Sequence, residues 1–322
     1  MDVRQSVTDR IIAMLEKGGN VFRERWTRAA SRGMPRNGKT GAPYHGANVL
    51  LLWDAAIEHG YASPLWLTYK QAASLGAQVR KGERAVLCAH FERTAGKAGA
   101  NARGDSPSDA PSNSAGGSDA GKEEGREEGG EWGREADDRE RSFLLCKPFW
   151  LFNVAQIDGL PSALVDAALA AEPSADRSPV EGALRFIGGC KADIRHGYDR
   201  AAYVPHADRI LMPDVERFTS HEAYCATVLQ ELVHWSGHPS RLARAFGQRF
   251  GDAAYAFEEL VAELGSAFVL GHIGLVDATI EGHAAYLEAW LQVLRNDRSA
   301  IFTAARLAGE AYEYILSREL PP

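Results

Sequence analysis

One stretch of the chain carries residues at the spacing of a metal-binding helix. Residues 228–235 read VLQELVHW, so Glu231 and His234 occupy two positions of the motif HExxH. In that motif two histidines one helical turn apart hold zinc, and the glutamate acts as general base on the metal-bound water. Here Gln230 replaces the first histidine, and a neutral amide oxygen is a poor zinc ligand beside imidazole. We therefore expect weakened zinc binding and impaired peptidase chemistry.

Cations and aromatic rings gather in the N-terminal part of the chain. Binding of single-stranded nucleic acid without sequence preference needs positive charges for the phosphates and flat rings on which bases stack. The cations form two groups, which comprise Arg23, Arg25, Arg28, Arg32, Arg36 and Lys39 around Trp26, and Lys70, Arg80, Lys81 and Arg84 after Trp66 and Tyr69. In the alternative interpretation Trp53 and Trp66 are core residues and the arginines form a solvated face. Composition alone favours neither.

The charge of the chain is unevenly distributed, although its net value is -7. Residues 1–92 contain 13 Lys and Arg against 8 Asp and Glu, whereas residues 142–322 contain 15 against 23. Only the N-terminal part is therefore basic, as a nucleic-acid partner requires.

The composition indicates a globular protein. Its 322 residues, 45% of them hydrophobic, suffice for two domains of ordinary size. The first twenty residues hold no uninterrupted apolar stretch, and no later run reaches the roughly 18 apolar residues of a membrane span. The four cysteines lie far apart without CxxC spacing, which is typical of reduced thiols. We expect a cytoplasmic protein without a membrane partner.

Two changes of composition divide the chain. Residues 94–138 consist mainly of Gly, Ser, Ala and charged residues, so we expect them to be disordered. Strand-like runs at 85–91 and 142–150 flank this segment and could pair as a hairpin. We therefore treat the segment as an insertion within a first domain of residues 1–161. A cluster of Pro, Ser and Asp in residues 162–178 indicates the linker to a second domain of residues 179–318.

The two domains differ in their periodicity. Apolar residues at helical spacing near the N-terminus, followed by turn-rich and strand-like segments, predict an α+β first domain. The second domain begins with a helix and a short extended segment. Apolar stripes at i, i+3 and i+4 spacing then predict long helices over residues 220–236, 253–271, 280–295 and 298–316. The predicted fold class is α+β, with a mainly helical second domain.

The N-terminal domain resembles the single-stranded-DNA-binding domain of ArdC-type antirestriction proteins. The resemblance rests on an ordered set that comprises Trp26, PRNGKTG at 35–41, YHGAN at 44–48, WLT at 66–68, Gln71, VRKGE at 79–83 and FNVAQIDGLP at 152–161. It implies DNA binding but assigns no contacts. From charge, aromaticity and polarity we predict that the DNA contacts are Arg23, Arg25, Trp26, Arg36, Asn37, Lys39, Tyr44, Asn48, Trp66, Lys70, Gln71, Arg80 and Lys81.

The C-terminal domain resembles the zincin-like metallopeptidase domain of the same family, which also occurs with TraC-type primases. The resemblance rests mainly on ELVHWSGH at 231–238 and YAFEELVAEL at 255–264. Such domains place a third metal ligand, a glutamate, on the helix after the motif. We favour Glu259 as this ligand and Glu263 as the residue that orients His234, although the reverse assignment also agrees with their spacing of four residues. Without the resemblance, Glu258, Glu259 and Glu263 would be read as an acidic helix face.

These observations predict a single-stranded-DNA-binding antirestriction protein that protects transferred plasmid DNA. Its metallopeptidase-like domain is degenerate, and its expected cofactor is zinc, weakened by Gln230. One alternative is an active zinc-dependent peptidase that cleaves an unknown protein substrate, with Glu231 as base and the N-terminal domain as targeting module. Another is an accessory protein associated with a conjugative primase, which is less favoured because the sequence shows no primase-type acidic metal cluster.

Overall fold

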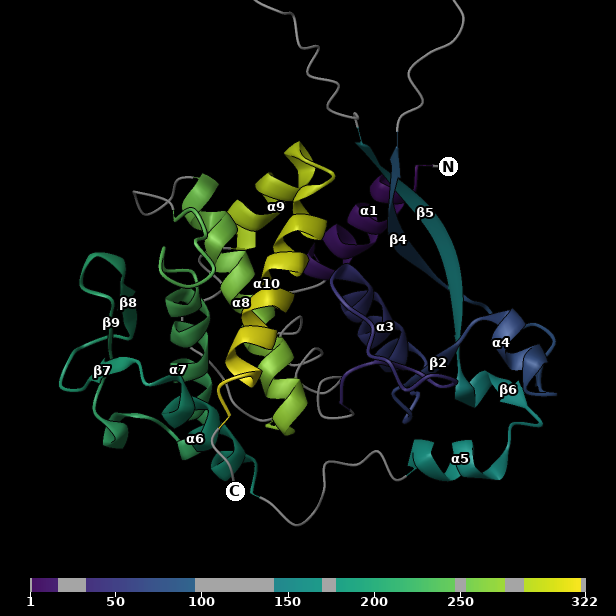
Figure 1. Cartoon of the computed structure of the whole chain (residues 1–322), viewed down its shortest axis with the longest axis horizontal. Helices are drawn as coiled ribbons and strands as arrows, with labels where there is room; N and C mark the ends of the chain where they lie inside the picture. Colours follow the sequence, from purple (N-terminus) through teal and green to yellow (C-terminus); the bar gives the residue numbers. More distant parts are fainter. Residues whose placement is uncertain are drawn as a thin grey trace, which may run out of the picture. The chain divides into compact units, whose positions relative to one another are not determined.

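A computed structural model describes residues 2–16, 33–95, 142–169, 178–246, 253–275 and 287–319. By its internal contacts the chain divides into two compact units, one of residues 1–90 with 146–322 and one of residues 91–145. The described residues form both helices and strands (Figure 1), so the fold is mixed α and β as the sequence predicts. Both predicted domains contribute to the larger unit, and the boundary between them stays a prediction.

The N-terminal part is built around a four-stranded sheet. In chain order its elements are α1 (Val3–Glu16), β1 (Arg36–Asn37), α3 (Ala47–Glu58), β2 (Leu65–Leu67), α4 (Tyr69–Ser74), β3 (Gln78–Val79), β4 (Val86–Ala95), β5 (Ser142–Asn153), β6 (Ile157–Asp158) and α5 (Ser162–Leu169). The sheet has the order β1-β2-β5-β4, in which β1 is parallel to β2 and β2 is antiparallel to β5. Strands β3 and β6 pair in a separate antiparallel ribbon.

The predicted pairing across the insertion is confirmed, because β4 and β5 are neighbours in the sheet. Residues 96–138 of the predicted insertion lie outside the described residues, so their disorder stays a prediction. The first half of the predicted linker, residues 162–169, forms the short helix α5.

Apolar side chains cover both faces of the N-terminal sheet. Helix α3 is almost entirely buried because its sequence, ANVLLLWDAAIE, is apolar on nearly all sides. Its Leu52 shares one cluster with Trp66 of β2 and Leu151 of β5. Leu67, the next residue of β2, belongs to a second cluster with the residues of α4, β3 and β6. Because consecutive strand residues point to opposite sides, the two clusters lie on opposite faces of the sheet.

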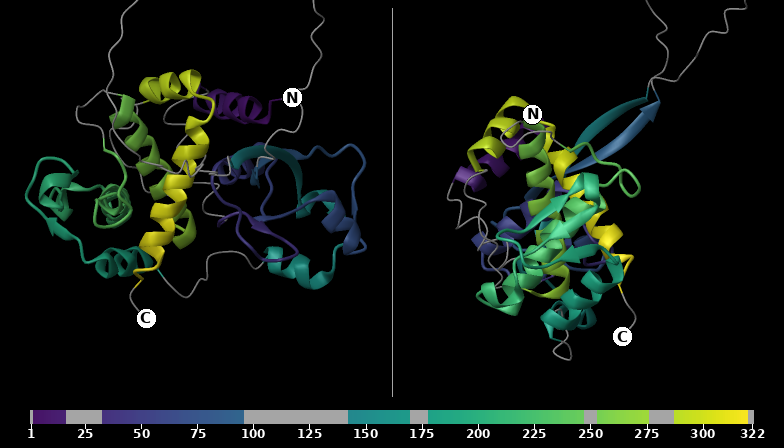
Figure 2. Two further views of the ribbon diagram at one scale, coloured as in Figure 1. Left: turned by 45° about the horizontal axis from the view of Figure 1, so that its top comes forward. Right: turned by 90° about the vertical axis from the view of Figure 1, so that its left-hand side faces the viewer.

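The C-terminal part consists of long helices and a three-stranded sheet. Its elements are α6 (Pro179–Cys190), β7 (Asp193–Arg195), β8 (Ala202–Val204), β9 (Arg209–Leu211), α7 (His221–Ser236), α8 (Ala253–Ile273), α9 (Leu287–Asn296) and α10 (Ala300–Leu316). The sheet has the order β7-β9-β8, with β9 parallel to β7 and antiparallel to β8, so β8 is an edge strand. Helix α8 packs against both α7 and α10 (Figure 2).

The predicted helices agree with those observed. The ranges 220–236, 253–271 and 298–316 correspond to α7, α8 and α10, and the described part of 280–295 corresponds to α9. Helix α7 is central to the C-terminal core, because residues 225–236 are all buried. Within the described ranges no helix is both long and apolar enough to cross a membrane.

Candidate functional site

Helices α7 and α8 bring the predicted metal-site residues together. Ser220 caps α7, since its hydroxyl accepts a hydrogen bond from the backbone N–H of Ala223 (3.1 Å). The helices approach closely at Gly265, where an added Cβ would lie 2.9 Å from a methyl group of Val233. The polar side chains at this contact are all buried and comprise Gln230, Glu231 and His234 on α7 and Glu258, Glu259 and Glu263 on α8.

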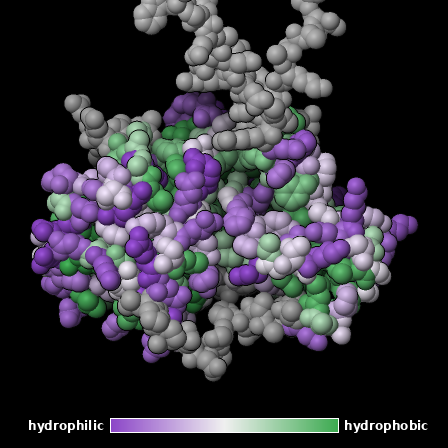
Figure 3. Space-filling view, viewed as in Figure 1, coloured by the Kyte–Doolittle hydropathy of each residue, from purple (hydrophilic) through white to green (hydrophobic). Residues whose placement is uncertain are grey.

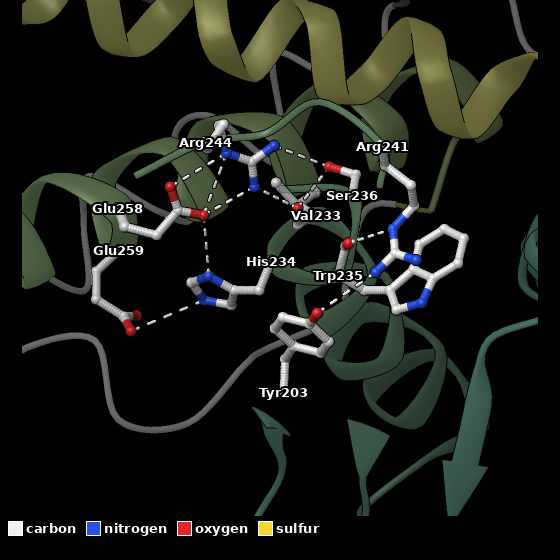
Figure 4. A network of polar contacts seen from close by, with 9 residues as sticks. All are labelled: Tyr203, Val233, His234, Trp235, Ser236, Arg241, Arg244, Glu258 and Glu259. Carbon is white, nitrogen blue, oxygen red and sulfur yellow. Dashed lines mark hydrogen bonds and ion pairs between the residues drawn. The ribbon is translucent and has the colours of Figure 1, made fainter. Parts of the chain in front are cut away.

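The imidazole of His234 lies between two carboxylates of α8 (Figure 4). Its Nδ1 is 3.3 Å from Oε1 of Glu258, and its Nε2 is 3.7 Å from Oε1 of Glu259. The favoured ligand Glu259 therefore faces the ring nitrogen that a metal would use. The sequence analysis favoured Glu263 as the residue that orients His234, but the structure gives the Nδ1 contact to Glu258 instead. Glu258 and Glu259 are adjacent in the sequence, and Glu263 lies four residues beyond Glu259. This spacing alone does not tell which of these carboxylates reaches Nδ1 of His234.

Arg244 holds the carboxylate of Glu258 in place next to the imidazole of His234. Its guanidinium contacts both carboxylate oxygens, with Nη2 2.8 Å from Oε1 and Nε 3.1 Å from Oε2. It also donates to the hydroxyl of Ser236 (2.9 Å) and the carbonyl of Val233 (2.5 Å) on α7. A Cβ at Gly237 would lie 2.8 Å from this guanidinium, so only glycine leaves room for it. Sequence reasoning missed Arg244, because a buried arginine in a loop carries no signal in a single sequence.

The charged side chains of the site shift one another's pKa values. Burial alone would lower the pKa of His234, but its hydrogen bond to Glu258 and the charges of Glu259 and Glu231 raise that pKa to about 9. Burial would raise the pKa of Glu258, yet His234 and Arg244 hold it below its ordinary value. At neutral pH the protein without a metal therefore carries an imidazolium at this position. A cation that binds Nε2 must displace its proton.

Glu231, the predicted general base, contacts an edge strand. Its Oε2 accepts a hydrogen bond from the backbone N–H of Tyr203 in β8 (2.7 Å). The hydroxyl of Tyr203 lies 3.0 Å from Oδ1 of Asp208, which also pairs with Arg241. The guanidinium of Arg241 stacks 3.9 Å from the ring centroid of Trp235 on α7. These contacts join β8 to α7 and fix the carboxylate of Glu231 at their interface.

The available donors fit a divalent cation only if Gln230 takes part. No group of three or more His, Cys, Asp or Glu side chains in the described part of the chain is arranged to hold a metal ion. Gln230 is 5% exposed, and its Oε1 is buried without a hydrogen-bond partner. A buried amide oxygen without a partner is costly, and a bound cation would relieve that cost. With His234 and Glu259, Gln230 would provide one nitrogen and two oxygen donors.

The predicted DNA contacts fall into several groups. Arg23, Arg25 and Trp26 lie outside the described residues. Trp66 is only 1% exposed and packs edge-on against Tyr61, with ring centroids 5.9 Å apart. Its ring faces are covered by protein, so Trp66 offers no stacking platform in this fold. The interpretation of Trp66 as a core residue, considered above as the alternative, agrees with this burial.

The predicted polar contacts are engaged within the fold. Asn48 accepts from the backbone N–H of Ala89 and donates to its carbonyl, both at 2.9 Å, which satisfies one residue of β4. The side chain of Gln71 accepts from the N–H of Thr68 and completes the capping box of α4. Asn37 accepts from the N–H groups of Lys39 and Thr40 in a turn. These amide side chains stabilise local structure. Their hydrogen bonds within the fold explain them without a contact to DNA.

Tyr44 is partly buried and lies 3.3 Å from the amide nitrogen of Asn37. Burial, as the largest cause, raises the pKa of its hydroxyl to about 12. Tyr44 is therefore neutral and packed beside the sheet.

The predicted cations remain at the surface. Arg36, Lys39, Lys70, Arg80 and Lys81 are all exposed. Arg80 is nevertheless held by Glu83 (2.9 Å), Asp158 (3.4 Å) and the carbonyl of Ala155 (2.6 Å). Lys39 donates to the hydroxyl of Ser74 on α4 (2.8 Å), which places its charge beside that helix.

Two family models match the chain in sequence order. The first, described as the N-terminal domain of the anti-restriction factor ArdC, matches residues 1–144. The second, described as a zincin-like metallopeptidase, matches residues 181–307. Their order agrees with the two domains expected from the sequence.

Solved structures and curated relatives match almost the whole chain. The metal-free crystal structure of the antirestriction ArdC protein from plasmid R388 is 34% identical, covers 99% of this chain and 98% of its own, and has a TM-score of 0.71. Its Mn(II)-bound structure is 33% identical over the same shares, with a TM-score of 0.70. An uncharacterized protein, y4eC of Sinorhizobium fredii, is 34% identical over 99% of this chain and 92% of its own length. The DNA primase TraC of Escherichia coli is 34% identical over 98% of this chain, which spans only 27% of that protein.

Proposed function

This chain belongs to the ArdC family of antirestriction proteins, and from that premise we propose that it binds single-stranded DNA and protects transferred plasmid DNA. The observation that carries the proposal is a basic surface within the region matched by the ArdC N-terminal domain. Lys39, Lys70 and Lys81 are exposed there, although the whole chain is acidic. Phosphates attract such cations and release condensed counterions, so this surface supports binding to a nucleic-acid backbone.

The test is the affinity for a labelled single-stranded oligonucleotide as a function of salt concentration. If the three exposed lysines each contact a phosphate, the logarithm of the binding constant falls with a slope of about -2 against the logarithm of salt concentration. Absence of binding, or binding that salt leaves unchanged, contradicts the proposal. The biological readout is the efficiency of plasmid transfer into a restricting host, with and without the protein.

The zincin-like domain is proposed to hold a divalent cation weakly through Gln230, His234 and Glu259. Its fit rests on the buried, unpartnered Oε1 of Gln230, one helical turn before His234, and on the imidazole of His234, which faces the carboxylate of Glu259. The Mn(II)-bound structure of the ArdC protein from plasmid R388 supports metal binding within this family. A divalent cation, when bound, supplies Lewis-acid polarisation of an oxygen ligand. Because an amide replaces an imidazole, zinc affinity is expected to be lower than that of a complete HExxH site.

The second candidate function is a zinc-dependent peptidase directed to an unknown protein substrate. It is favoured by one observation, the retention of Glu231 and His234 on one buried helix face next to Glu259. The discriminating measurement is the zinc content of the purified wild type and of Gln230→His, with DNA affinity recorded on the same samples. Stoichiometric zinc in the wild type favours the peptidase. Zinc in the variant alone, with equal DNA binding by both, favours the DNA-binding protein.

A role as a primase-associated accessory protein remains the least favoured alternative. The TraC relatives contain a region similar to this chain, but the chain spans only 27% and 20% of the two TraC proteins compared. Their primase activity is therefore not carried over to this chain.

A further inference from the structure

Two aromatic rings project from the N-terminal part into solvent. Tyr69 and Trp150 are each 51% exposed, in contrast to Trp53 and Trp66, which are 2% and 1% exposed. A half-exposed aromatic ring can be reached from solvent, as base stacking requires. In the described part of the N-terminal region, these two rings are the aromatic side chains available for stacking.

Tyr69 and Trp150 both lie just beyond the same end of the β2–β5 pairing. Strands β2 and β5 are antiparallel, and their last registered pair is Leu67 with Phe152. Tyr69 lies two residues beyond Leu67, and Trp150 lies two residues beyond Phe152 in the same direction along the sheet. Thr68 is still extended (φ -75°, ψ 159°), so the chain continues along that direction before α4 begins. Trp150 also shares the sheet face of Phe152, because strand residues two apart point to the same side.

Both rings are held by rigid elements. Trp150 belongs to β5, which is flanked by β2 and β4. Tyr69 opens α4, whose start is fixed by the capping box of Thr68 and Gln71, and its hydroxyl lies 3.1 Å from the amide nitrogen of Gln78. Rings fixed in this way lose little conformational entropy when a flat ligand binds.

Two exposed lysines lie along the helix that Tyr69 opens. Lys70 follows Tyr69 on α4, and Lys39 is bonded to Ser74 at the end of the same helix. Hydrophobic and hydrophilic side chains are interspersed on this part of the surface, over α4, β6 and α5 (Figure 3). Aromatic faces bordered by lysines suit unpaired bases joined by phosphates better than an apolar protein partner.

We propose that Tyr69 and Trp150 are the base-stacking platform of this protein, and that Lys39 and Lys70 contact the phosphates of the same strand. The inference rests on the proposed single-stranded-DNA binding and assigns its contacts. It replaces Trp66 as the stacking residue. Because every base has a stacking face, the platform binds single strands with little sequence preference and excludes bases that remain paired in a duplex.

The test compares Tyr69→Ala and Trp150→Ala with the matched control Tyr198→Ala. Tyr198 is also exposed (42%) but lies in the C-terminal part. Loss of one stacked base is expected to weaken single-strand affinity about 5- to 150-fold for each of the first two variants, and the control should bind as the wild type does. The salt slope should stay unchanged in the aromatic variants, whereas Lys70→Ala should reduce it by about 0.7.

Trp150→Phe keeps an aromatic ring and separates stacking from folding. This variant should retain most of the affinity, and the quenching of tryptophan emission by DNA should be smaller than in the wild type. Wild type that binds no single strand refutes the proposed function. If the wild type binds single strands, and folded Tyr69→Ala and Trp150→Ala variants bind them equally well, the stacking platform is refuted and the proposed function stands. If Trp150→Ala is unfolded, the platform is tested by the single-strand affinity of Tyr69→Ala and by the quenching of tryptophan emission by DNA in Trp150→Phe.

Discussion

Arg244 is the residue whose loss should most clearly reveal how the buried site is held together. Its guanidinium, nearly inaccessible to solvent, joins Glu258 of α8 to the carbonyl of Val233 and the hydroxyl of Ser236 on α7. Replacement by methionine keeps an unbranched side chain of similar length but removes the charge and all donors. The variant then leaves a buried carboxylate with His234 as its remaining cationic partner.

The expected loss of stability is large. Removal of one partner of a buried ion pair costs about 3–5 kcal/mol, because the other charge stays buried. For a domain of ordinary size each kcal/mol lowers Tm by about 2–4 °C, so Arg244→Met should melt about 6–20 °C below the wild type. Loss of an ordinary surface ion pair would cost only about 0–1 kcal/mol, so the size of the decrease in Tm distinguishes a buried ion pair from a surface one.

The pH dependence gives a second criterion. The pKa of Glu258 is lowered in the folded protein, so its contribution is present above the unfolded pKa of about 4.3 and is lost as pH falls. The difference in free energy of unfolding between the wild type and Arg244→Met should therefore have its largest value at pH 7 and become smaller below about pH 4.

Denaturation of both proteins by heat and by urea measures these effects. Arg244→Met/Glu258→Gln is the control, because the neutral amide can still contact His234 without leaving a buried charge. It should recover much of the lost stability. A decrease in Tm of less than about 2 °C in the single variant, or a double variant less stable than the single one, would refute the reasoning.

Three further outcomes follow from the same geometry. Asn48→Ala should cost about 1–3 kcal/mol in urea denaturation, because both backbone groups of Ala89 lose their partner, and an unchanged midpoint would contradict this role. Gly237→Ala should destabilise by about 1–3 kcal/mol, since its Cβ would meet the guanidinium of Arg244 at 2.8 Å, and Gly309→Ala, with nothing within 4 Å, is the matched control. Chelator-treated protein should lose stability as pH rises from about 6.5 towards 9, because the folded pKa of His234 is raised to about 9, and His234→Gln should abolish that loss.

The main elements of the C-terminal part could be predicted from the sequence because its helices are long and periodic. The stripe from Ala253 to Ile273 repeats over five turns, so its position is insensitive to any single residue. The choice of Glu259 rests on the family resemblance, which implies a glutamate ligand on the helix after the motif, and Oε1 of Glu259 lies 3.7 Å from Nε2 of His234. The four-residue spacing of Gln230 and His234 placed the two side chains on one face of α7.

The environment of each polar side chain could not be read from the sequence. Whether Glu258 or Glu263 reaches Nδ1 depends on how α7 and α8 cross, which is set by the close approach at Gly265. The position of Arg244 depends on the path of the chain after α7. Trp66 belongs to a short strand whose two faces are both covered, and a tryptophan beside lysines has the same composition whether it stacks on bases or fills a core.

The replacement at position 230 is compatible with a stable fold because the site has its own cations. In a zinc site the metal neutralises the carboxylates that face it, and its loss leaves them repelling one another. Here Arg244 and the protonated His234 provide positive charge for Glu258 and Glu259, while Glu231 is bonded to the backbone of Tyr203. We therefore expect the folded state to be stable without a bound metal. A domain with this arrangement can keep the zincin fold for packing or partner binding, while the proposed DNA binding would be carried by the basic N-terminal surface.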